Sequence, residues 1–187
     1  ARALPAYRAE NAAWLERDGL YEILRAEHGG GWRSWGGDGE PDRRLYAPGP
    51  GEAPALARRR MELLRRHADA LEDYALIQLL LHEQHRLFQV HARRLGLSLF
   101  GDLQVGMSDR DEWAAQAFLL EGWRLGAPPS RTNPEGQPWN YAVLDPRRYE
   151  EVDGAGGRRA GPAVRFLAAR VRKMLAEVDG LRIDHPH

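Results

Sequence analysis

The chain contains no cysteine and almost no lysine. Without cysteine it can form no disulfides, no thiolate metal sites and no cysteine nucleophile. Lys173 is the single lysine among 27 basic residues, and 27 acidic residues balance them, so the formal net charge is zero. A neutral chain has no global field to attract nucleic acid or a membrane surface. We therefore expect neither of them as a partner.

Long apolar runs are also missing. None reaches the roughly 18 residues that a membrane-spanning helix needs. The first residues resemble neither a signal peptide nor a transit peptide, which favours a cytoplasmic location. At 187 residues and 43% hydrophobic residues, the chain is nevertheless large enough to bury a core.

The first part of the chain has the apolar spacing of helices. Residues 3–28 predict two short helices separated at Gly19, residues 55–66 predict an arginine-rich helix, and residues 69–95 predict a longer one. The predicted inner stripe of the longest helix consists of Leu71, Tyr74, Ile77, Leu81, Phe88 and Leu95.

Residues 29–54 are rich in glycine and proline and predict a loop. Trp32 and Trp35 lie inside it. A loop with two tryptophans packs either onto the protein core or against a sugar ring, and core packing is the simpler interpretation.

His82 and His85 are three residues apart on the predicted helix. The helical zinc motif of metalloproteases needs histidines four residues apart with a glutamate after the first. We therefore predict no metal site, and we interpret these histidines as solvated or hydrogen-bonded.

The apolar pattern changes after residue 96. Residues 97–100 predict a buried parallel strand that ends at Gly101-Asp102. Ser108 is a predicted cap for a short helix from Asp109. Residues 122–146 predict a long loop, of the kind that is usually functional.

Residues 146–152 predict a short helical segment, and a glycine-rich link at 154–161 follows it. The next predicted helix begins at Pro162 and runs to about Val178. Its predicted stripe consists of Val164, Leu167, Val171, Met174, Leu175 and Val178.

The final eight residues, 180–187, read as a short strand with charged residues at its far end. Arg182 and Asp184 share one face, because side chains alternate along a strand. A structural ion pair explains them as well as a catalytic carboxylate beside its charge partner. These residues alone leave both interpretations open.

The second half thus reads as strand, long excursion, helix, strand, which predicts two parallel strands joined by a helical crossover. Both strands end near a carboxylate, Asp102 and Asp184. Neighbouring strands lie about 4.8 Å apart, and α/β barrels place their chemistry at the carboxyl ends of strands. We expect the two acids at one mouth.

Three motifs resemble the amylomaltases, which are 4-α-glucanotransferases also called disproportionating enzymes. The first is FGDLQVG at residues 100–106, followed by DEWA at 111–114. The second is GAPP at 126–129 with GQPW at 136–139, and the third is LRIDH at 181–185. The wider α-amylase superfamily shares the third motif, whereas the second is much more specific. The clear resemblance covers roughly residues 70–187.

The resemblance implies an α/β fold that is part of a (β/α)8 TIM barrel with a largely helical insertion. Residues 1–68 would be the insertion with its Gly/Pro-rich loop, and residues 69–187 a partial catalytic barrel holding two strands. Because the family takes its catalytic acid from the strand after the nucleophile, the chain is expected to be an internal segment, inactive alone.

The resemblance also implies the site residues. Asp184 would be the nucleophile, Arg182 its charge partner, and His185 a donor to the bound sugar. Asp102, Gln137 and Trp139 would line the glucan groove. Departures from the family pattern include Asn140, which stands where a glycine is usual.

The expected activity is transfer of α-1,4-glucan segments between malto-oligosaccharides by a retaining double displacement, with no cofactor and no metal. Malto-oligosaccharides and α-1,4-glucans are the expected partners, and the sequence leaves the oligomeric state open. Two alternatives stand beside this function: a non-catalytic glucan-binding or structural segment, and a hydrolase of the α-amylase superfamily.

Overall fold

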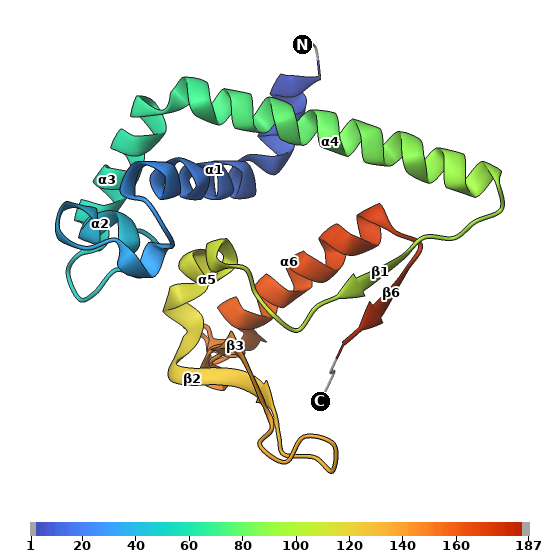
Figure 1. Cartoon of the computed structure of the whole chain (residues 1–187). Coiled ribbons are helices and arrows are strands. Elements are labelled where there is room, and N and C mark those ends of the chain that lie inside the picture. Colours follow the sequence, from blue (N-terminus) through green and yellow to red (C-terminus); the bar gives the residue numbers. More distant parts are fainter. Residues whose placement is uncertain (1–2, 185–187) are drawn as a thin grey trace. The chain divides into compact units, whose positions relative to one another are not determined.

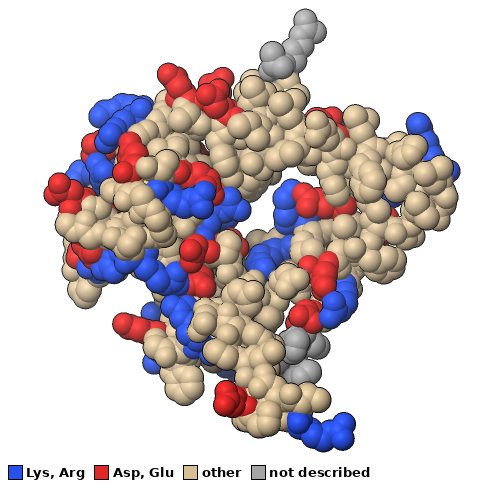
Figure 2. All heavy atoms as spheres, viewed as in Figure 1, with Lys and Arg blue, Asp and Glu red and all other residues tan. Residues whose placement is uncertain are grey.

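The structure is a computed structural model that describes residues 3–184 (Figure 1). The described residues form two compact units, 3–97 and 98–184. Within the described range, no helix combines the length and the apolar character needed to cross a bilayer. Figure 2 shows basic and acidic side chains intermixed over the face in view, as the zero net charge predicts.

The first unit is helical. Its elements are α1 (Leu4–His28), η1 (Trp32–Ser34), η2 (Gly37–Gly39), α2 (Glu40–Arg43), α3 (Ala53–Arg66) and α4 (Ala68–Arg94). The helices α1 and α4 pack against each other around a core of Leu4, Tyr7, Leu15, Ala75 and Leu79. The two helices predicted at 55–66 and 69–95 are confirmed.

The predicted break at Gly19 is wrong, because α1 continues through this residue. A Cβ atom at Gly19 would lie 2.7 Å from Leu71 Cδ2 and 3.2 Å from Tyr74 Cδ1. Glycine is therefore present for close packing of α1 on α4, and this contact outweighs its low helix propensity.

The predicted inner stripe of α4 is only partly right. Leu71 is buried and Tyr74 packs against the core. The remaining predicted members are 53–62% exposed: Ile77, Leu81, Phe88 and Leu95. The described contacts of α1 with α4 run from Leu71 to His82, whose ring lies 5.6 Å from that of Tyr7. Ile77 and Leu81 lie within this stretch but stay exposed, because its buried residues on α4 are Leu71, Ala75 and Leu79. Phe88 and Leu95 lie beyond it.

The segment 29–54 is not wholly a loop, since it contains η1, η2 and α2. Trp35 is 2% exposed and its ring contacts those of Tyr21 and His28, which confirms core packing for this tryptophan. Trp32 is half-buried, and the Arg33 guanidinium lies 4.4 Å from the centre of its ring.

The second unit is mixed α/β. Its helical elements are α5 (Asp109–Ala115), η3 (Gln116–Phe118), η4 (Pro146–Arg148) and α6 (Pro162–Glu177). Its strands are β1 (Phe100–Leu103), β2 (Leu119–Ala127), β3 (Gln137–Leu144), β4 (Glu150–Val152), β5 (Arg158–Ala160) and β6 (Gly180–Ile183). The strands form three pairs: β1 with β6, β2 with β3, and β4 with β5.

The parallel pairing of β1 with β6 is confirmed. The first strand begins at Phe100, three residues later than predicted, so Asp102 lies within it rather than after it. The Ser108 cap is confirmed, since its side chain accepts a hydrogen bond from the Asp111 backbone N–H. Pro162 begins α6, also as predicted.

The stripe predicted for α6 is partly exposed. Val164, Leu167 and Leu175 are 36–53% exposed. Met174 and Val178 instead face β1, because a Cβ atom at Gly101 would lie 3.0 Å and 3.2 Å from their side chains. The helix therefore packs on the strand pair through its C-terminal part.

Two regions predicted as loops contain antiparallel hairpins. Most of residues 122–146 belongs to β2 and β3, and residues 158–160 form β5, paired with β4. The helical segment predicted for 146–152 is limited to η4. In β2 and β3, register shifts interrupt the apolar alternation that identifies a strand in a sequence.

The mixed α/β class is confirmed for the described residues. Membership of a barrel requires strands beyond the one parallel pair described here. The division into an insertion at 1–68 and a partial barrel at 69–187 also stays a prediction. The boundary between the two compact units falls between residues 97 and 98 of the chain. The helix α4 belongs to the first unit because it packs with α1.

Candidate active site

Arg182 bridges the two carboxylates predicted to meet at the strand ends. Its Nη1 donates to Asp102 Oδ2 at 2.7 Å, and its Nη2 donates to Asp184 Oδ1 at 2.8 Å. Asp102 and Arg182 are direct partners in the parallel register of β1 and β6. Arg182 and Asp184 are two residues apart, so they lie on the same face. The two acids therefore lie close together on one strand pair, as expected, while a barrel mouth around them stays a prediction.

The three side chains are open to solvent. Their side-chain exposures are 67% for Arg182, 41% for Asp102 and 24% for Asp184. Exposed ion pairs contribute roughly 0–1 kcal/mol to stability. At these exposures the two ion pairs add little to the stability of the strand pair.

The register that brings these residues together is fixed at both ends of the strand pair. Before β6, Asp179 accepts a hydrogen bond from the Leu99 N–H through Oδ2 at 2.9 Å and donates its own N–H to the Leu99 carbonyl at 2.8 Å. After β6, the Asp184 N–H donates to the Leu103 carbonyl at 3.2 Å. A slip by one residue would move Arg182 to the opposite face.

Gln137 and Trp139 lie together on β3. The Trp139 Nε1–H donates to Gln137 Oε1 at 3.3 Å. On the facing strand the neighbours Leu125 and Gly126 pair with Tyr141 and Pro138. The register therefore shifts at Trp139 and Asn140, which form a bulge. Bulges of this kind re-aim side chains and are frequent next to active sites.

Asn140 is the described non-glycine residue with a positive φ, at 61°. Asparagine tolerates this left-handed conformation better than most residues, although less well than glycine. The glycine that is usual at this position in the resembling family suits the same backbone.

The loop between β2 and β3 is closed by two glycines of the GAPP and GQPW motifs. A Cβ atom at Gly126 would lie 2.5 Å from the Gln137 carbonyl oxygen, and one at Gly136 would lie 2.6 Å from that of Ala127. Both positions exclude any other residue at this geometry. The close approach at these two glycines therefore fixes the position of Gln137, the first residue of β3.

Sequence reasoning missed the part played by Glu112 on α5. This carboxylate is 3% exposed, accepts the Ala142 N–H through Oε1 at 3.1 Å, and pairs through Oε2 with Arg124 Nη1 at 3.2 Å. It thus joins α5 to both strands of the hairpin that carries Gln137 and Trp139. In the sequence, Glu112 is only a charged residue beside Trp113 in a short capped helix, which is a weak indication of a special role. Its burial in the structure reveals that role.

His185 lies outside the described residues, so its predicted contact with sugar stays a prediction. Within residues 3–184, no three side chains of the metal-binding types lie close enough to share an ion.

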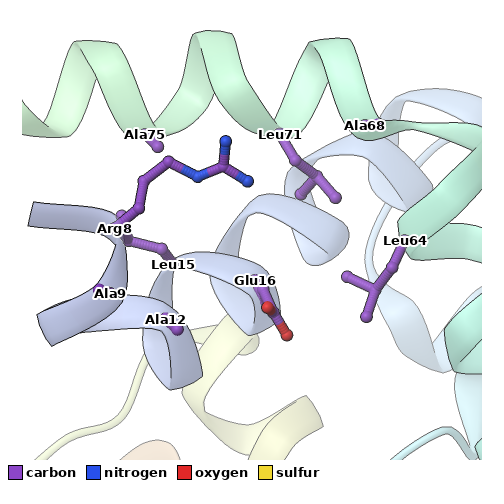
Figure 3. A pocket seen from close by; sticks show the side chains of 9 residues that line it. All are labelled: Arg8, Ala9, Ala12, Leu15, Glu16, Leu64, Ala68, Leu71 and Ala75. Carbon is purple, nitrogen blue, oxygen red and sulfur yellow. The ribbon is translucent and has the colours of Figure 1, made fainter. Parts of the chain in front are cut away.

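The first unit contains a pocket of about 300 Å³ between α1, α3 and α4 (Figure 3). Its lining is Arg8, Ala9, Ala12, Leu15, Glu16, Leu64, Ala68, Leu71 and Ala75. The charged members form ion pairs, Arg8 with Glu72 and Glu16 with Arg60. None of the predicted site residues lines it.

Comparison with known proteins identifies the family of the chain. The family model described as 4-alpha-glucanotransferase matches residues 1–186. Proteins named 4-alpha-glucanotransferase are 29% identical in Mycobacterium tuberculosis, 28% in Aquifex aeolicus and 26% in Thermus thermophilus. These matches cover 98%, 94% and 98% of this chain, but 23%, 33% and 34% of the respective relatives. The chain spans about a quarter to a third of their length, and it belongs to the 4-alpha-glucanotransferase family.

Proposed function

We propose that this chain is a segment of a 4-α-glucanotransferase that contributes β1 and β6 as neighbouring strands of a (β/α)8 barrel. The complete enzyme would transfer α-1,4-glucan segments between malto-oligosaccharides. The observation that carries the proposal is the Arg182 bridge between Asp102 and Asp184, on adjacent parallel strands of a chain in this family.

Asp184 is the nucleophile in this proposal. A carboxylate oxygen attacks the anomeric carbon, the bond to the leaving oxygen breaks, and a covalent glycosyl-aspartate forms. The leaving oxygen takes a proton from a second carboxyl group, which we expect on a further strand of the complete enzyme. The hydroxyl of an acceptor sugar then attacks the same carbon, releases Asp184, and returns a proton to that second group.

Arg182 orients the nucleophile. Its Nη2 holds Asp184 Oδ1, while Nη1 is held by Asp102 Oδ2. The guanidinium is planar, so two carboxylates on one guanidinium fix its direction as well as its position. It also places a positive charge beside the carboxylate that attacks.

The β2–β3 hairpin supplies glucan contacts. The ring of Trp139 suits stacking on the face of a pyranose, and the Gln137 amide both donates to and accepts from hydroxyl groups. The hydrogen bond between them orients the Gln137 oxygen toward the indole. A sugar-covered site excludes water, which favours attack by an acceptor hydroxyl over hydrolysis. His185 would donate to the sugar at the cleavage position.

The decisive experiment changes Asp184→Asn in a full-length protein that contains this chain. We expect transfer between malto-oligosaccharides to fall by several orders of magnitude, because the covalent intermediate cannot form. Retention of more than about a thousandth of the rate contradicts the nucleophile assignment. The unchanged protein must lengthen and shorten maltotriose. Glucose and maltose without longer products would instead indicate a hydrolase.

A second experiment addresses the non-catalytic alternative. Incubated alone with maltotriose, this chain should give no longer or shorter products, because retaining catalysis needs a second carboxyl group about 5–5.5 Å from the nucleophile. Clear disproportionation by the isolated chain would mean that Asp102 or another described carboxyl group serves as the acid.

A further inference from the structure

Glu112 contacts one facing pair of residues in the β2–β3 hairpin. Arg124 and Ala142 are direct partners in the antiparallel register. Glu112 binds the Arg124 side chain with Oε2 and the Ala142 main-chain N–H with Oε1. One carboxylate from α5 therefore holds both strands at the same register position.

This register position has a particular place in the hairpin. On one side lies the irregular stretch of β2 between Leu119 and Arg124, and on the other lies the bulge of Trp139 and Asn140. The pairs Arg124–Ala142 and Leu125–Tyr141 are the regular ladder between these two irregularities. By holding the first of these pairs, Glu112 fixes the position of the ladder, and the bulge begins directly beside it.

Burying the Glu112 carboxylate costs folding free energy unless its contacts offset that cost. The residue is 3% exposed, and Arg124, its charge partner, is 44% exposed. Burying a charged group is unfavourable unless it is paired and hydrogen-bonded. Ala142 is also buried, so without Glu112 its N–H would lose its described partner. An apolar residue at 112 could fill the space but could not hold either strand.

We propose that Glu112 is a positioning residue for glucan binding, which sets the direction of Trp139 and Gln137 through the hairpin without touching the sugar. This inference rests on the proposed function, in which those two residues contact the glucan. It predicts that changes at Glu112 weaken sugar binding and the preference for transfer, and leave the attack by Asp184 largely intact.

The test uses three variants of the full-length protein. Glu112→Ala removes both contacts, Glu112→Gln keeps an oxygen for the Ala142 N–H but removes the charge, and Arg124→Gln removes the charge from the other side. We expect Glu112→Ala to raise KM for maltotriose about 10-fold and to lower the ratio of transfer to hydrolysis, with kcat within about 3-fold. Glu112→Gln and Arg124→Gln should both give smaller effects, and their combination should not be additive.

A direct readout is hydrogen exchange at the Ala142 amide. Exchange should accelerate in Glu112→Ala and stay slow in Glu112→Gln, in parallel with KM. Faster exchange with unchanged KM and transfer ratio would overturn the inference and leave Glu112 a purely structural residue. A fall in kcat alone would overturn it as well. If Glu112→Ala does not fold, KM of the other two variants decides: a raised KM in Glu112→Gln and Arg124→Gln that is not additive in their combination supports the inference, and an unchanged KM in both overturns it.

The failure of this inference is distinguishable from failure of the proposed function. If Asp184→Asn retains full transfer, the proposed function is wrong whatever the Glu112 variants do. If Asp184→Asn is inactive and the Glu112 variants bind maltotriose normally, only the positioning role is wrong.

Discussion

The ring of Tyr141 lies directly against Gly106, where a Cβ atom would be 2.6 Å from the ring carbon Cζ. The carbonyl of Gly106 in turn accepts a hydrogen bond from Arg170 Nη2 at 3.1 Å. Gly106 thus joins three elements: the segment after β1, the strand β3 and the helix α6. Through this residue the hairpin with Trp139 and the strand pair with Asp184 belong to one packed unit.

Gly106→Ala should destabilise this junction. The added methyl group overlaps the Tyr141 ring, and overpacking of this kind costs about 1–3 kcal/mol. The free energy of unfolding, measured by denaturant titration, gives the cost. Gly36→Ala is the matched control, because a Cβ atom there has no neighbour within 4 Å and φ is −120°. In the double variant Gly106→Ala with Tyr141→Ala, the two effects should be less than additive. Full additivity would show that the ring is not the obstacle.

Asn140 should accept glycine and reject β-branched residues. Asn140→Gly keeps the left-handed backbone, so stability should change by less than about 1 kcal/mol. Asn140→Val should cost at least about 1–2 kcal/mol, because its Cβ clashes in this conformation. Comparison of the two unfolding midpoints, together with the exposure of Trp139 by fluorescence quenching, tests the bulge. Equal midpoints would contradict the described backbone.

Arg182→Lys should impair catalysis although the charge is kept. An ammonium group is a point charge and cannot hold two carboxylates in the plane that the guanidinium provides. Loss of one charge-assisted hydrogen bond corresponds to roughly a 10- to 100-fold fall in kcat in the full-length protein. Asp102→Asn, which keeps an acceptor oxygen, is the conservative comparison and should lose less activity. Wild-type kcat in Arg182→Lys would show that bridging is not required.

Asp42 should be the most sensitive carboxylate of the first unit. It is fully buried and accepts hydrogen bonds from Arg59 Nε at 2.7 Å and Arg59 Nη2 at 3.0 Å, with His28 Nε2 also at 3.0 Å. Asp42→Asn removes the buried charge partner of Arg59, which keeps only its pair with the exposed Glu62, at a cost of about 3 kcal/mol. Glu72→Gln, which breaks the exposed pair with Arg8, is the control and should cost less than about 1 kcal/mol. Similar losses would contradict the importance of burial.

The same residue predicts a loss of stability in acid. Burial raises the pKa of Asp42, but hydrogen bonds from Arg59 and His28 outweigh burial and hold the pKa below its ordinary value of 3.8. A depressed folded-state pKa gives stability that is complete above the unfolded value and is lost as pH falls through the folded value. Unfolding titrations from pH 6 to pH 2, values chosen to span roughly that range, should show a steeper decline for the wild type than for Asp42→Asn. Parallel curves would exclude the linkage.

Local signals predicted the helices well and the contacts between elements poorly. The Ser108 cap and Pro162 mark helix starts through bonds within a few residues, and both were confirmed. The β2–β3 hairpin was missed because its register shifts break the alternation of apolar residues. The predicted stripe of α4 was partly wrong because the sequence does not show which residues of α4 the helix α1 covers.

The candidate site divides in the same way. The motif residues predicted Asp102, Arg182 and Asp184 as one group, and parallel pairing follows from two short apolar segments with a helix between them. Glu112 could not be predicted, because its partners are a main-chain amide and a side chain from two strands that the sequence does not identify.

The sharing of Arg182 has a consequence for the charge of the site. One guanidinium faces two carboxylates, so with both ionised the three side chains keep a net charge of −1. A sugar that is losing its leaving group develops positive charge at the anomeric carbon and ring oxygen. A residual negative charge at that point stabilises this oxocarbenium character, whereas a second cation beside Asp102 would cancel it. In the proposed mechanism, the bridge would therefore orient Asp184 without neutralising the site.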